Sequence, residues 1–347
     1  MSSKIAPTPY FDDVTNGSAQ PGCSLEQQTN RLKVRIAKRF NEATDICTFE
    51  LVDVKGGLLP VFTAGSHIDV YLPNGITRQY SLFNDPSERH RYLIAVLNAE
   101  DSRGGSKTMH ERMKEGDTLS ISAPRNHFPL ARQAKRSLLL AGGIGVTPIL
   151  CMAERLMTEG AEFEMHYCSR SIDRTAFVER IQSSAFGPKV QFHFDDGAPD
   201  QKLDLATVLA PDLADTQLYV CGPKGFMDAV LSIARDKGWS EEDLHYEFFS
   251  AQPVDTDNDS SFEVKLARSG RIVSIPKDKT IVQALAEVGI ELPTSCEQGV
   301  CGACITRVLE GEPDHRDLYL TPDEQARNDQ FTPCCSRAKS KLLVLDL

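Results

Sequence analysis

Positive charge is scarce in this chain of 347 residues. Lys and Arg together number 38, against 49 Asp and Glu, which gives a formal net charge of −11 at pH 7. Proteins bind phosphate backbones through clustered positive charge, so this balance excludes nucleic acid as an expected partner.

Long hydrophobic runs are also missing. The longest uncharged stretch, 137–153, has 17 residues and contains three glycines and Pro148, so it suits a turn better than a membrane span. The amino terminus lacks a basic start followed by an apolar run, so no signal peptide is predicted. We therefore expect a soluble cytoplasmic protein that does not associate with membranes.

Cysteine, by contrast, is abundant, with ten residues. In the reducing cytoplasm, clustered cysteines more often hold a metal or carry out redox chemistry than form disulfides. The densest group is Cys296, Cys301 and Cys304, followed thirty residues later by Cys334 and Cys335. This C-x4-C-x2-C…C spacing is typical of plant-type [2Fe–2S] ferredoxins. Spacing alone does not choose between Cys334 and Cys335 as the fourth ligand. A zinc site is the less favoured alternative, because structural zinc usually takes two short knuckles.

The residue pattern divides the chain into three domains and a tail, in line with the two to three domains that its length predicts. Residues 1–28 are polar and predict a flexible tail. Short β-branched runs broken by Gly, Pro and Asn predict an antiparallel β-barrel over 29–132. Strands alternating with helices predict a parallel α/β sheet over 133–250. An acidic linker, 251–261, then leads to a carboxy-terminal domain over 262–347.

The predicted elements are short. The barrel strands are expected at 32–39, 46–52, 67–72, 91–96 and 118–121, with a short helix at 107–113. The α/β strands are expected at 137–141, 164–168, 190–194 and 217–221, with helices at 149–159, 176–182, 205–209 and 224–237. In the carboxy-terminal domain, two alternating strands joined at 269–270 precede a helix at 281–288.

Two glycine turns follow strands of the predicted α/β sheet. Glycines at such a turn let a pyrophosphate approach the backbone amides of a helix amino terminus, where the dipole favours negative charge. The first turn is not the Rossmann fingerprint, because Pro148 replaces its last glycine. Neighbouring parallel strands would bring both turns to the carboxyl edge, where ligands bind, although a tight turn without a ligand is the alternative. The candidate residues are Gly142, Gly143, Gly145, Thr147, Pro148, Cys221, Gly222 and Pro223.

A third candidate site lies in the barrel. The run 78–82, Arg-Gln-Tyr-Ser-Leu, offers an Arg for phosphate, a Tyr for a ring and a Ser hydroxyl in alternating strand positions, which suits a flavin. A strand that binds no ligand is the alternative. The run 103–106, Arg-Gly-Gly-Ser, precedes a short helix and makes a second plausible phosphate cradle.

Several short motifs occur in an order that this chain shares with one family. They are R-Q-Y-S-L, R-G-G-S, A-G-G-I-G-V-T-P, C-G-P, H-Y-E-F-F-S, C-E-Q-G-V-C-G-A-C, D-H-R-D and C-C-S-R-A. From about Leu32 to Leu347 the chain resembles the phthalate dioxygenase reductase family, and the reductases of vanillate demethylase and carnitine monooxygenase look like close relatives. The resemblance implies a multidomain fold: an antiparallel β-barrel flavin domain, an α/β parallel-sheet nucleotide domain and an α+β β-grasp ferredoxin domain.

The resemblance also implies FMN rather than FAD, with the phosphate near 103–106 and Phe249 stacked on the isoalloxazine. It implies Cys334 as the fourth iron ligand. NADH is favoured over NADPH, although the basic segment 169–174 holds an Arg that is able to accept a 2′-phosphate. The predicted cofactor-binding residues are Arg78, Tyr80, Ser81, Leu82, Arg103, Gly104, Gly105, Ser106, Gly142, Gly143, Gly145, Thr147, Pro148, Cys221, Gly222, Pro223, Glu247 and Phe249, and the predicted metal ligands are Cys296, Cys301, Cys304 and Cys334.

The three implied cofactors, NADH, a flavin and a [2Fe–2S] cluster, form a chemically consistent series. NADH gives two electrons as a hydride, whereas a [2Fe–2S] cluster accepts one, and a flavin bridges the mismatch. The predicted enzyme is an NADH-dependent iron–sulfur flavoprotein oxidoreductase. Ser81 is the candidate hydrogen-bond donor near flavin N5, and Thr147 and Cys221 are candidates for placing the nicotinamide.

The electrons need an acceptor outside the chain. The sequence holds no C-x-H…C-x2-H pair of the Rieske type, so the chain is not expected to oxygenate a substrate itself. We expect a monomeric reductase component of a two-component Rieske non-heme iron oxygenase, which docks at the ferredoxin domain around 296–304. The alternatives are a reductase for a cytochrome P450 or a diiron hydroxylase, and a redox-sensing interaction protein.

Overall fold

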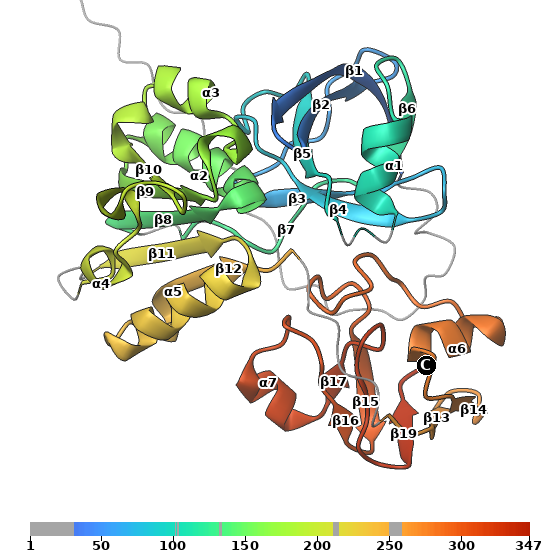
Figure 1. Ribbon diagram of the computed structural model, residues 1–347. Coiled ribbons are helices and arrows are strands. Elements are labelled where there is room, and N and C mark those ends of the chain that lie inside the picture. The colour runs from blue at the N-terminus through green and yellow to red at the C-terminus, as the bar shows by residue number, and fades with distance from the viewer. Residues whose placement is uncertain (1–30, 101, 103, 132–133, 211–214, 250–258) are drawn as a thin grey trace, which may run out of the picture.

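The computed structural model describes residues 31–100, 102, 104–131, 134–210, 215–249 and 259–347. The predicted tail, 1–28, lies outside these residues. Each of the three main sheets is built from one continuous part of the chain (Figure 1). The predicted multidomain fold, with an antiparallel barrel, a parallel sheet and a mixed carboxy-terminal sheet, is confirmed.

The first body is an antiparallel barrel with strand order β4-β3-β6-β1-β2-β5 and β7 paired to β3. The Phe83 N–H donates to the Leu93 carbonyl at 3.1 Å, which joins the chain after β4 to β5 and closes the barrel. All five predicted strands are present. The elements are β1 Leu32–Ala43, β2 Ile46–Asp53, β3 Ser66–Tyr71, β4 Thr77–Ser81, β5 Tyr92–Leu97, α1 Gly105–Arg112, β6 Thr118–Ile121 and β7 Arg125–Asn126.

The second body is a wholly parallel sheet with order β10-β9-β8-β11-β12. The direction of strand addition reverses between β8 and β11, so the carboxyl ends of these two strands form the topological switch point where such sheets bind ligands. The elements are β8 Arg136–Gly142, α2 Val146–Glu159, β9 Glu162–Ser169, α3 Val178–Ser183, β10 Val190–Phe194, α4 Leu205–Val208, β11 Thr216–Cys221, α5 Lys224–Asp236 and β12 Leu244–Glu247. Short 3₁₀ turns lie at Gly143–Gly145, Ile172–Arg174, Gly187–Lys189, Pro199–Gln201 and Glu241–Asp243.

Two features of this sheet differ from the sequence expectation. Helix α2 begins at Val146 rather than at 149, because Pro148 falls in its first turn, where the missing N–H costs nothing. Strand β12 is not predicted from the sequence, because it has only four residues and most of them are polar.

The carboxy-terminal domain is a mixed sheet with order β14-β13-β19-β15-β17. Helix α6 carries a capping box, in which Thr280 and Gln283 bond each other's backbone amides, and it buries Ile281 and Leu285 against the sheet. The elements are β13 Phe262–Leu266, β14 Ile272–Ile275, α6 Ile281–Glu287, β15 Thr306–Glu310, β16 Pro313–Asp314, α7 Pro322–Arg327, β17 Gln330–Phe331, β18 Arg337–Ala338 and β19 Leu342–Leu345. Only β13, β14 and α6 were expected from the sequence.

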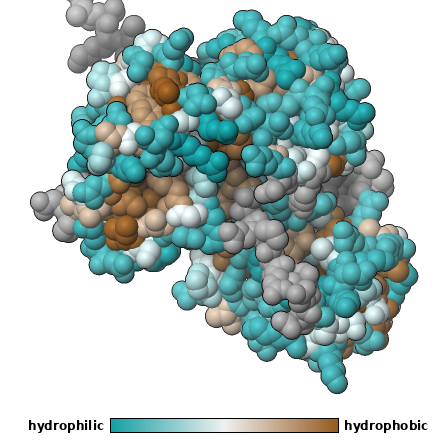
Figure 2. Space-filling model, viewed as in Figure 1, coloured by the Kyte–Doolittle hydropathy of each residue, from teal (hydrophilic) through white to brown (hydrophobic). Residues whose placement is uncertain are grey.

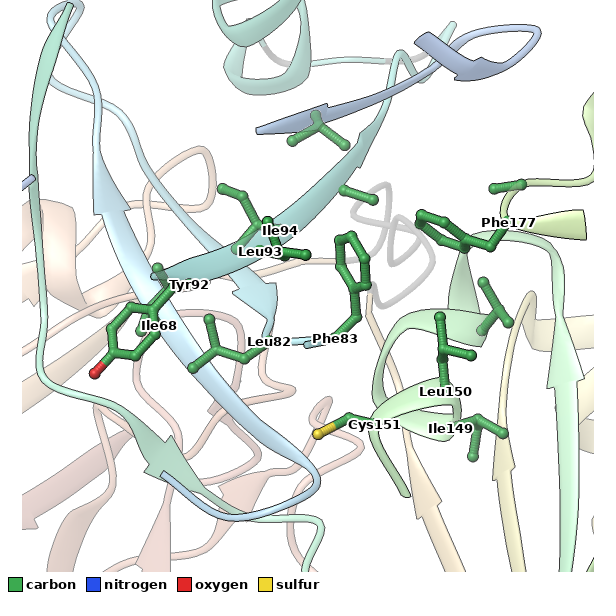
Figure 3. Close-up of a cluster of buried hydrophobic side chains, with 14 of the residues drawn as sticks. Ile68, Leu82, Phe83, Tyr92, Leu93, Ile94, Ile149, Leu150, Cys151 and Phe177 are labelled. Atoms are coloured by element: carbon green, nitrogen blue, oxygen red, sulfur yellow. The ribbon is translucent and has the colours of Figure 1, made fainter. Parts of the chain in front are cut away.

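The barrel and the parallel sheet share one continuous hydrophobic core, whereas the carboxy-terminal domain has its own. Figure 3 shows where the two bodies meet: Phe83 of the barrel faces Phe177 of the α/β body, and their ring centroids lie 4.6 Å apart. The thiol of Cys151 on α2 donates to the Asn84 carbonyl at 3.3 Å. Cys151 therefore has the structural role expected of a small buried side chain, and these two bodies form one packed unit.

The predicted linker is tied down at its carboxyl end. Residues 251–258 lie outside the described part of the chain, but the Asp259 carboxylate accepts two hydrogen bonds from Arg316, at 2.5 and 3.1 Å. Arg337 lies 3.3 Å from the same carboxylate. The chain is thus fixed to the carboxy-terminal domain from Asp259 onward, two residues before the predicted end of the linker.

On the face that Figure 2 shows, the surface is largely hydrophilic, and apolar side chains gather in patches over the parallel-sheet body as well as in the hollow between the bodies. In the part of the chain that the structure describes, no helix is both long and apolar enough to cross a membrane.

Candidate functional site

Strand β4 carries the barrel motif. Ser81 lies opposite His67 in the pairing of β4 with β3, and its side chain is buried. Tyr80 is largely enclosed, and burial raises the pKa of its hydroxyl. Leu82 is directed into the barrel core, and its N–H donates to the Ser66 carbonyl at 2.8 Å. Arg78 and Tyr80 lie on one face of β4 and Ser81 lies on the other, and these three remain the candidates for a ligand contact.

The second barrel motif lies directly beside Arg78. A Cβ placed on Gly105 would come within 2.5 Å of the Arg78 Nε atom, so the arginine side chain runs across the first turn of α1. Gly104 caps this helix without a side-chain hydrogen bond, and Ser106 donates to Ser102 at 2.8 Å. Arg103 lies outside the described residues. A guanidinium beside the amides of a helix amino terminus is a suitable phosphate site.

The two glycine turns also lie together, as the sequence predicts. Ala141 at the end of β8 pairs with Cys221 at the end of β11. A Cβ on Gly145 would overlap the Cys221 carbonyl and lie 2.6 Å from the Gly222 nitrogen, so the turns approach each other as only glycine allows. This packing requires Gly145 whether or not a nucleotide binds. The position of the turns at the switch point is the feature that favours a nucleotide.

The other residues of these turns have differing surroundings. Gly142 lies against Pro223, and Gly143 opens the turn with a positive φ of 53°. The Thr147 hydroxyl donates to the Ile144 carbonyl at 3.1 Å and is buried, so it stabilises its own turn. Pro148 is buried in the first turn of α2.

Glu247 joins the barrel site to the parallel-sheet site. It ends β12 and pairs with Cys221 on β11, and its carboxyl group lies close enough to the Ser81 hydroxyl for that hydroxyl to lower its pKa. Its Oε1 atom lies 3.9 Å from His67 Nδ1, and its Oε2 atom has no hydrogen-bond partner among the described residues. Ser81 and Cys221, predicted from separate domains, thus meet at one carboxyl group.

Burial sets the protonation of this group of side chains. It raises the pKa of Glu247 to about 8 against the lowering effect of the Ser81 hydrogen bond. Burial, assisted by the positive charge of Arg125, lowers the pKa of His67 to about 4. Burial and the Glu247 carboxylate raise the pKa of the Cys221 thiol well above its usual value. Near pH 7 the site therefore holds a mostly neutral carboxylic acid, a neutral imidazole and a thiol.

Phe249 follows β12 two residues after Glu247. Its side chain is 39% exposed, at the end of the described segment. His67 is the participant that the sequence analysis missed. The sign that the sequence offers is that His67 and Asp69 are polar residues alternating with apolar ones within a predicted strand.

The cysteine loop gathers four buried sulfurs. The thiol of Cys296 lies within hydrogen-bonding reach of Cys301 and Cys334, and Cys334 also reaches Cys304. Backbone N–H groups point at two of the sulfurs: Gln298 donates to Cys296 at 3.3 Å and Ala303 donates to Cys301 at 3.5 Å. Four convergent thiols with amide donors fit an iron–sulfur cluster, because such donors stabilise the sulfur charge and tune the potential.

Cys335 has different contacts, although it adjoins Cys334. Its sulfur lies 3.3 Å from the Thr332 hydroxyl and 3.8 Å from the Ser336 hydroxyl, and it packs on Gly299. The structure therefore brings Cys334, and not Cys335, toward Cys296 and Cys304. These contacts favour Cys334 as the fourth ligand, which stays a prediction.

Two protein-family models match parts of this chain. A model described as "2Fe-2S iron-sulfur cluster binding domain" matches residues 264–339. A model described as "Dimethylamine monooxygenase subunit DmmA-like, N-terminal domain" matches residues 122–244. The first match confirms the cluster type predicted from the cysteine spacing, in preference to zinc.

Known proteins are similar over nearly the whole chain. The vanillate O-demethylase oxidoreductase of Pseudomonas putida is 56% identical over 313 residues, which are 90% of this chain and 98% of that protein. A solved phthalate dioxygenase reductase, described as a modular structure for electron transfer from pyridine nucleotides to [2Fe–2S], is 40% identical with a TM-score of 0.74 and covers 92% of this chain and 99% of its own. An intact type IV self-sufficient cytochrome P450 monooxygenase is 38% identical with a TM-score of 0.81, over 95% of this chain and 43% of its own.

Proposed function

Because this chain belongs to the phthalate dioxygenase reductase family, the oxidoreductases that pass electrons to oxygenase systems, we propose that it takes a hydride from NADH onto FMN and sends single electrons through its [2Fe–2S] cluster to a Rieske-type oxygenase. The observation that carries this proposal is the meeting of Ser81 and Cys221 at Glu247. It brings the candidate flavin strand and the candidate nicotinamide edge into one site.

The residues around this site have distinct tasks. Arg78 and the amino terminus of α1, which lie side by side, would hold the phosphate of FMN, and Tyr80 and Ser81 would hold its ring system. Cys221 and the two glycine turns would place the nicotinamide, and Phe249 would contact the flavin ring. When bound, FMN accepts a hydride and returns single electrons, and the cluster carries one electron at a time.

The chain itself orients these groups and excludes water. The neutral Glu247 carboxyl group keeps negative charge away from the place of the hydride and holds the Ser81 hydroxyl in position. The shared core of the barrel and the parallel sheet keeps the two binding faces at a fixed separation, which hydride transfer needs.

The preference for NADH has support in the adenosine region. The segment 169–174 holds two arginines that would be able to receive a 2′-phosphate. One of them, Arg174, lies 3.4 Å from the Asp45 carboxylate. Asp173 adds a second carboxylate next to it, held by Ser171 and Thr44. Two carboxylates beside the arginine disfavour a dianionic phosphate there.

A reductase for a cytochrome P450 is the second candidate function. The observation that favours it is the match of this chain to part of a self-sufficient P450 monooxygenase. The names of the vanillate O-demethylase relatives favour a separate oxygenase, which would dock on the rim of the cysteine loop, 296–304. A redox-sensing role is disfavoured because the candidate flavin strand and the candidate nicotinamide edge meet within one chain.

The proposal is tested by turnover with purified partners. The FMN- and cluster-replete protein is mixed with NADH and either a Rieske-type demethylase or a P450 that lacks its reductase, and product is measured. NADH-dependent product with the Rieske enzyme alone supports the proposal, and product with the P450 alone supports the second candidate. A protein that does not reduce cytochrome c with NADH contradicts both.

A further inference from the structure

The carboxy-terminal domain touches the barrel through a buried hydrogen bond. The Ser295 hydroxyl donates to the Asp69 Oδ1 atom at 2.6 Å, across 226 positions of the sequence. Asp69 lies on β3 and is 3% exposed, and Ser295 is 4% exposed. Ser295 is also the residue directly before Cys296, so this bond fixes the start of the cysteine loop.

The barrel alone already holds the Asp69 carboxylate in place. Arg125 on β7 bonds its Oδ2 atom, and Gln79 on β4 donates to its Oδ1 atom at 3.2 Å. Arg125 pairs with this carboxylate, and a hydrogen bond to a charged acceptor is stronger than one between neutral groups. The carboxy-terminal domain adds one hydroxyl donor to an acceptor that is preorganised for it.

A second contact holds the other end of the loop. The ring of Tyr319 meets the ring of His127 edge to face, at 6.1 Å and 85°. Tyr319 also lies on Gly302, where an added Cβ would come within 2.4 Å of the tyrosine ring. The cysteine loop is thus held against the barrel at Ser295 and at Gly302.

On its other side, the carboxy-terminal domain stands away from the parallel sheet. A cleft of about 450 Å³ separates Leu231, Arg235 and Phe248 from Leu320 and Gln325. The hydrophobic core of the domain is separate as well. Interfaces between domains of one chain resemble transient protein interfaces, so one buried bond strongly affects how the domain is placed.

We propose that the Asp69–Ser295 hydrogen bond is a docking latch, which holds the cysteine loop against the barrel and aims Cys296 at the flavin site. Asp69 and Ser295 are positioning residues: release of their bond frees the loop to turn toward the oxygenase. The effect on electron passage rests on the proposed function, whereas the docking itself does not.

The test uses the full-length, cofactor-replete protein with Ser295→Ala. Loss of a hydrogen bond to a charged group lowers the ratio of docked to undocked molecules by about tenfold to a hundredfold. X-ray scattering in solution reports this as a larger radius of gyration, and hydrogen exchange reports it as faster exchange in 290–304. Rapid mixing with NADH follows the two electron steps: reduction of the flavin keeps its rate, and the following reduction of the cluster slows.

Asp69→Asn is the second variant, because it weakens the same bond without touching the cysteine loop. The double variant is expected to be no more undocked than Ser295→Ala alone, since both changes remove one interaction. Ser269→Ala is the matched control: this serine is exposed, and its hydroxyl accepts only the Arg271 N–H at 3.3 Å.

The outcomes are separable. Unchanged scattering and exchange in Ser295→Ala with an intact cluster overturn the latch. If Ser295→Ala fails to assemble its cluster, unchanged docking in Asp69→Asn overturns it instead. If NADH fails to reduce the cluster of the unaltered protein, the proposed function falls, while the scattering comparison still decides the latch.

Discussion

At the scale of single residues, Glu247 has more influence on the site than any motif suggests. It is a carboxyl group without local partners on its own strand, and it contacts Ser81 of the barrel and Cys221 of the parallel sheet. The burial that these contacts create raises its pKa to about 8. A residue that the sequence marks only as part of H-Y-E-F-F-S thus sets the charge of the site.

The shifted pKa of Glu247 predicts how stability depends on pH. The folded state keeps a proton that the unfolded state releases between about pH 4.5 and 8, so the contribution of Glu247 falls as pH rises through this window. His67, with a folded pKa of about 4, acts oppositely from pH 4 to 6.5. The contributions of Glu247 and His67 to the pH dependence of stability offset each other below pH 6.5, and only that of Glu247 remains above pH 6.5.

We therefore expect Glu247→Gln to be increasingly more stable, relative to the unaltered protein, as pH rises from 6.5 to 8. The slope for one proton is at most about 1.4 kcal/mol per pH unit. Thermal unfolding measured at several pH values checks this. Glu287→Gln, a change at an exposed carboxylate, is the control and leaves the pH dependence as it is. Parallel curves for Glu247→Gln and the unaltered protein would contradict the prediction.

Cys334 and Cys335 provide a matched pair of adjacent residues. Only the Cys334 sulfur reaches Cys296 and Cys304, so we expect Cys334→Ser to lose the cluster and its electron transfer to cytochrome c. Cys335→Ser is expected to keep both. Iron and sulfide content, with the electron paramagnetic resonance of the reduced protein, measures the difference. The flavin should still be reduced by NADH in both variants. Cluster loss in Cys335→Ser alone would reverse the assignment.

At the scale of elements, the contact between the glycine turns determines how β8 and β11 present their carboxyl ends. We expect Gly145→Ala to cost about 1–3 kcal/mol, because its Cβ would overlap the Cys221 carbonyl, and to raise the KM for NADH. Denaturant unfolding and steady-state kinetics measure these effects.

Gly225 on α5 is the matched glycine for this experiment. An added Cβ there meets no atom within 4 Å, and alanine is a better helix former. Gly225→Ala should therefore stabilise the protein by up to about 1 kcal/mol. Equal destabilisation by both substitutions would mean that the packing of the turns is not the cause.

At the scale of the whole molecule, we expect the chain to unfold as two units, the barrel together with the parallel sheet and the carboxy-terminal domain by itself. The barrel and the parallel sheet share a core, and the carboxy-terminal domain does not take part in it. Phe83 lies in the shared core and is 1% exposed, so Phe83→Ala is expected to cost about 3–5 kcal/mol there. Calorimetry should show one transition shifted and the other unmoved.

Leu343→Ala is the converse variant, because Leu343 is fully buried in the carboxy-terminal core. It should shift only the transition that Phe83→Ala leaves in place. A single transition moved by both substitutions would show that all three bodies unfold together.

The features that depend on neighbours along the chain can be predicted from the residues alone. The cysteine spacing predicts the cluster, the alternation of strands and helices predicts the parallel sheet, and the succession of strands places both glycine turns at one edge of it. Short strands such as β12 are not predicted, because four mostly polar residues show no hydrophobic periodicity. These features follow from the local geometry of the backbone, which a short stretch of sequence specifies.

Only the tertiary structure decided which distant residues meet. Nothing local links Ser81 to Glu247, or Asp69 to Ser295, because their contacts arise from how separate bodies pack. The use of the few positive charges is also a tertiary property. The composition gives their number, but only the fold shows that Arg125 pairs with Asp69 in the barrel. Burial then fixes the protonation and strength of such pairs, and burial is a property of the assembled fold rather than of any segment.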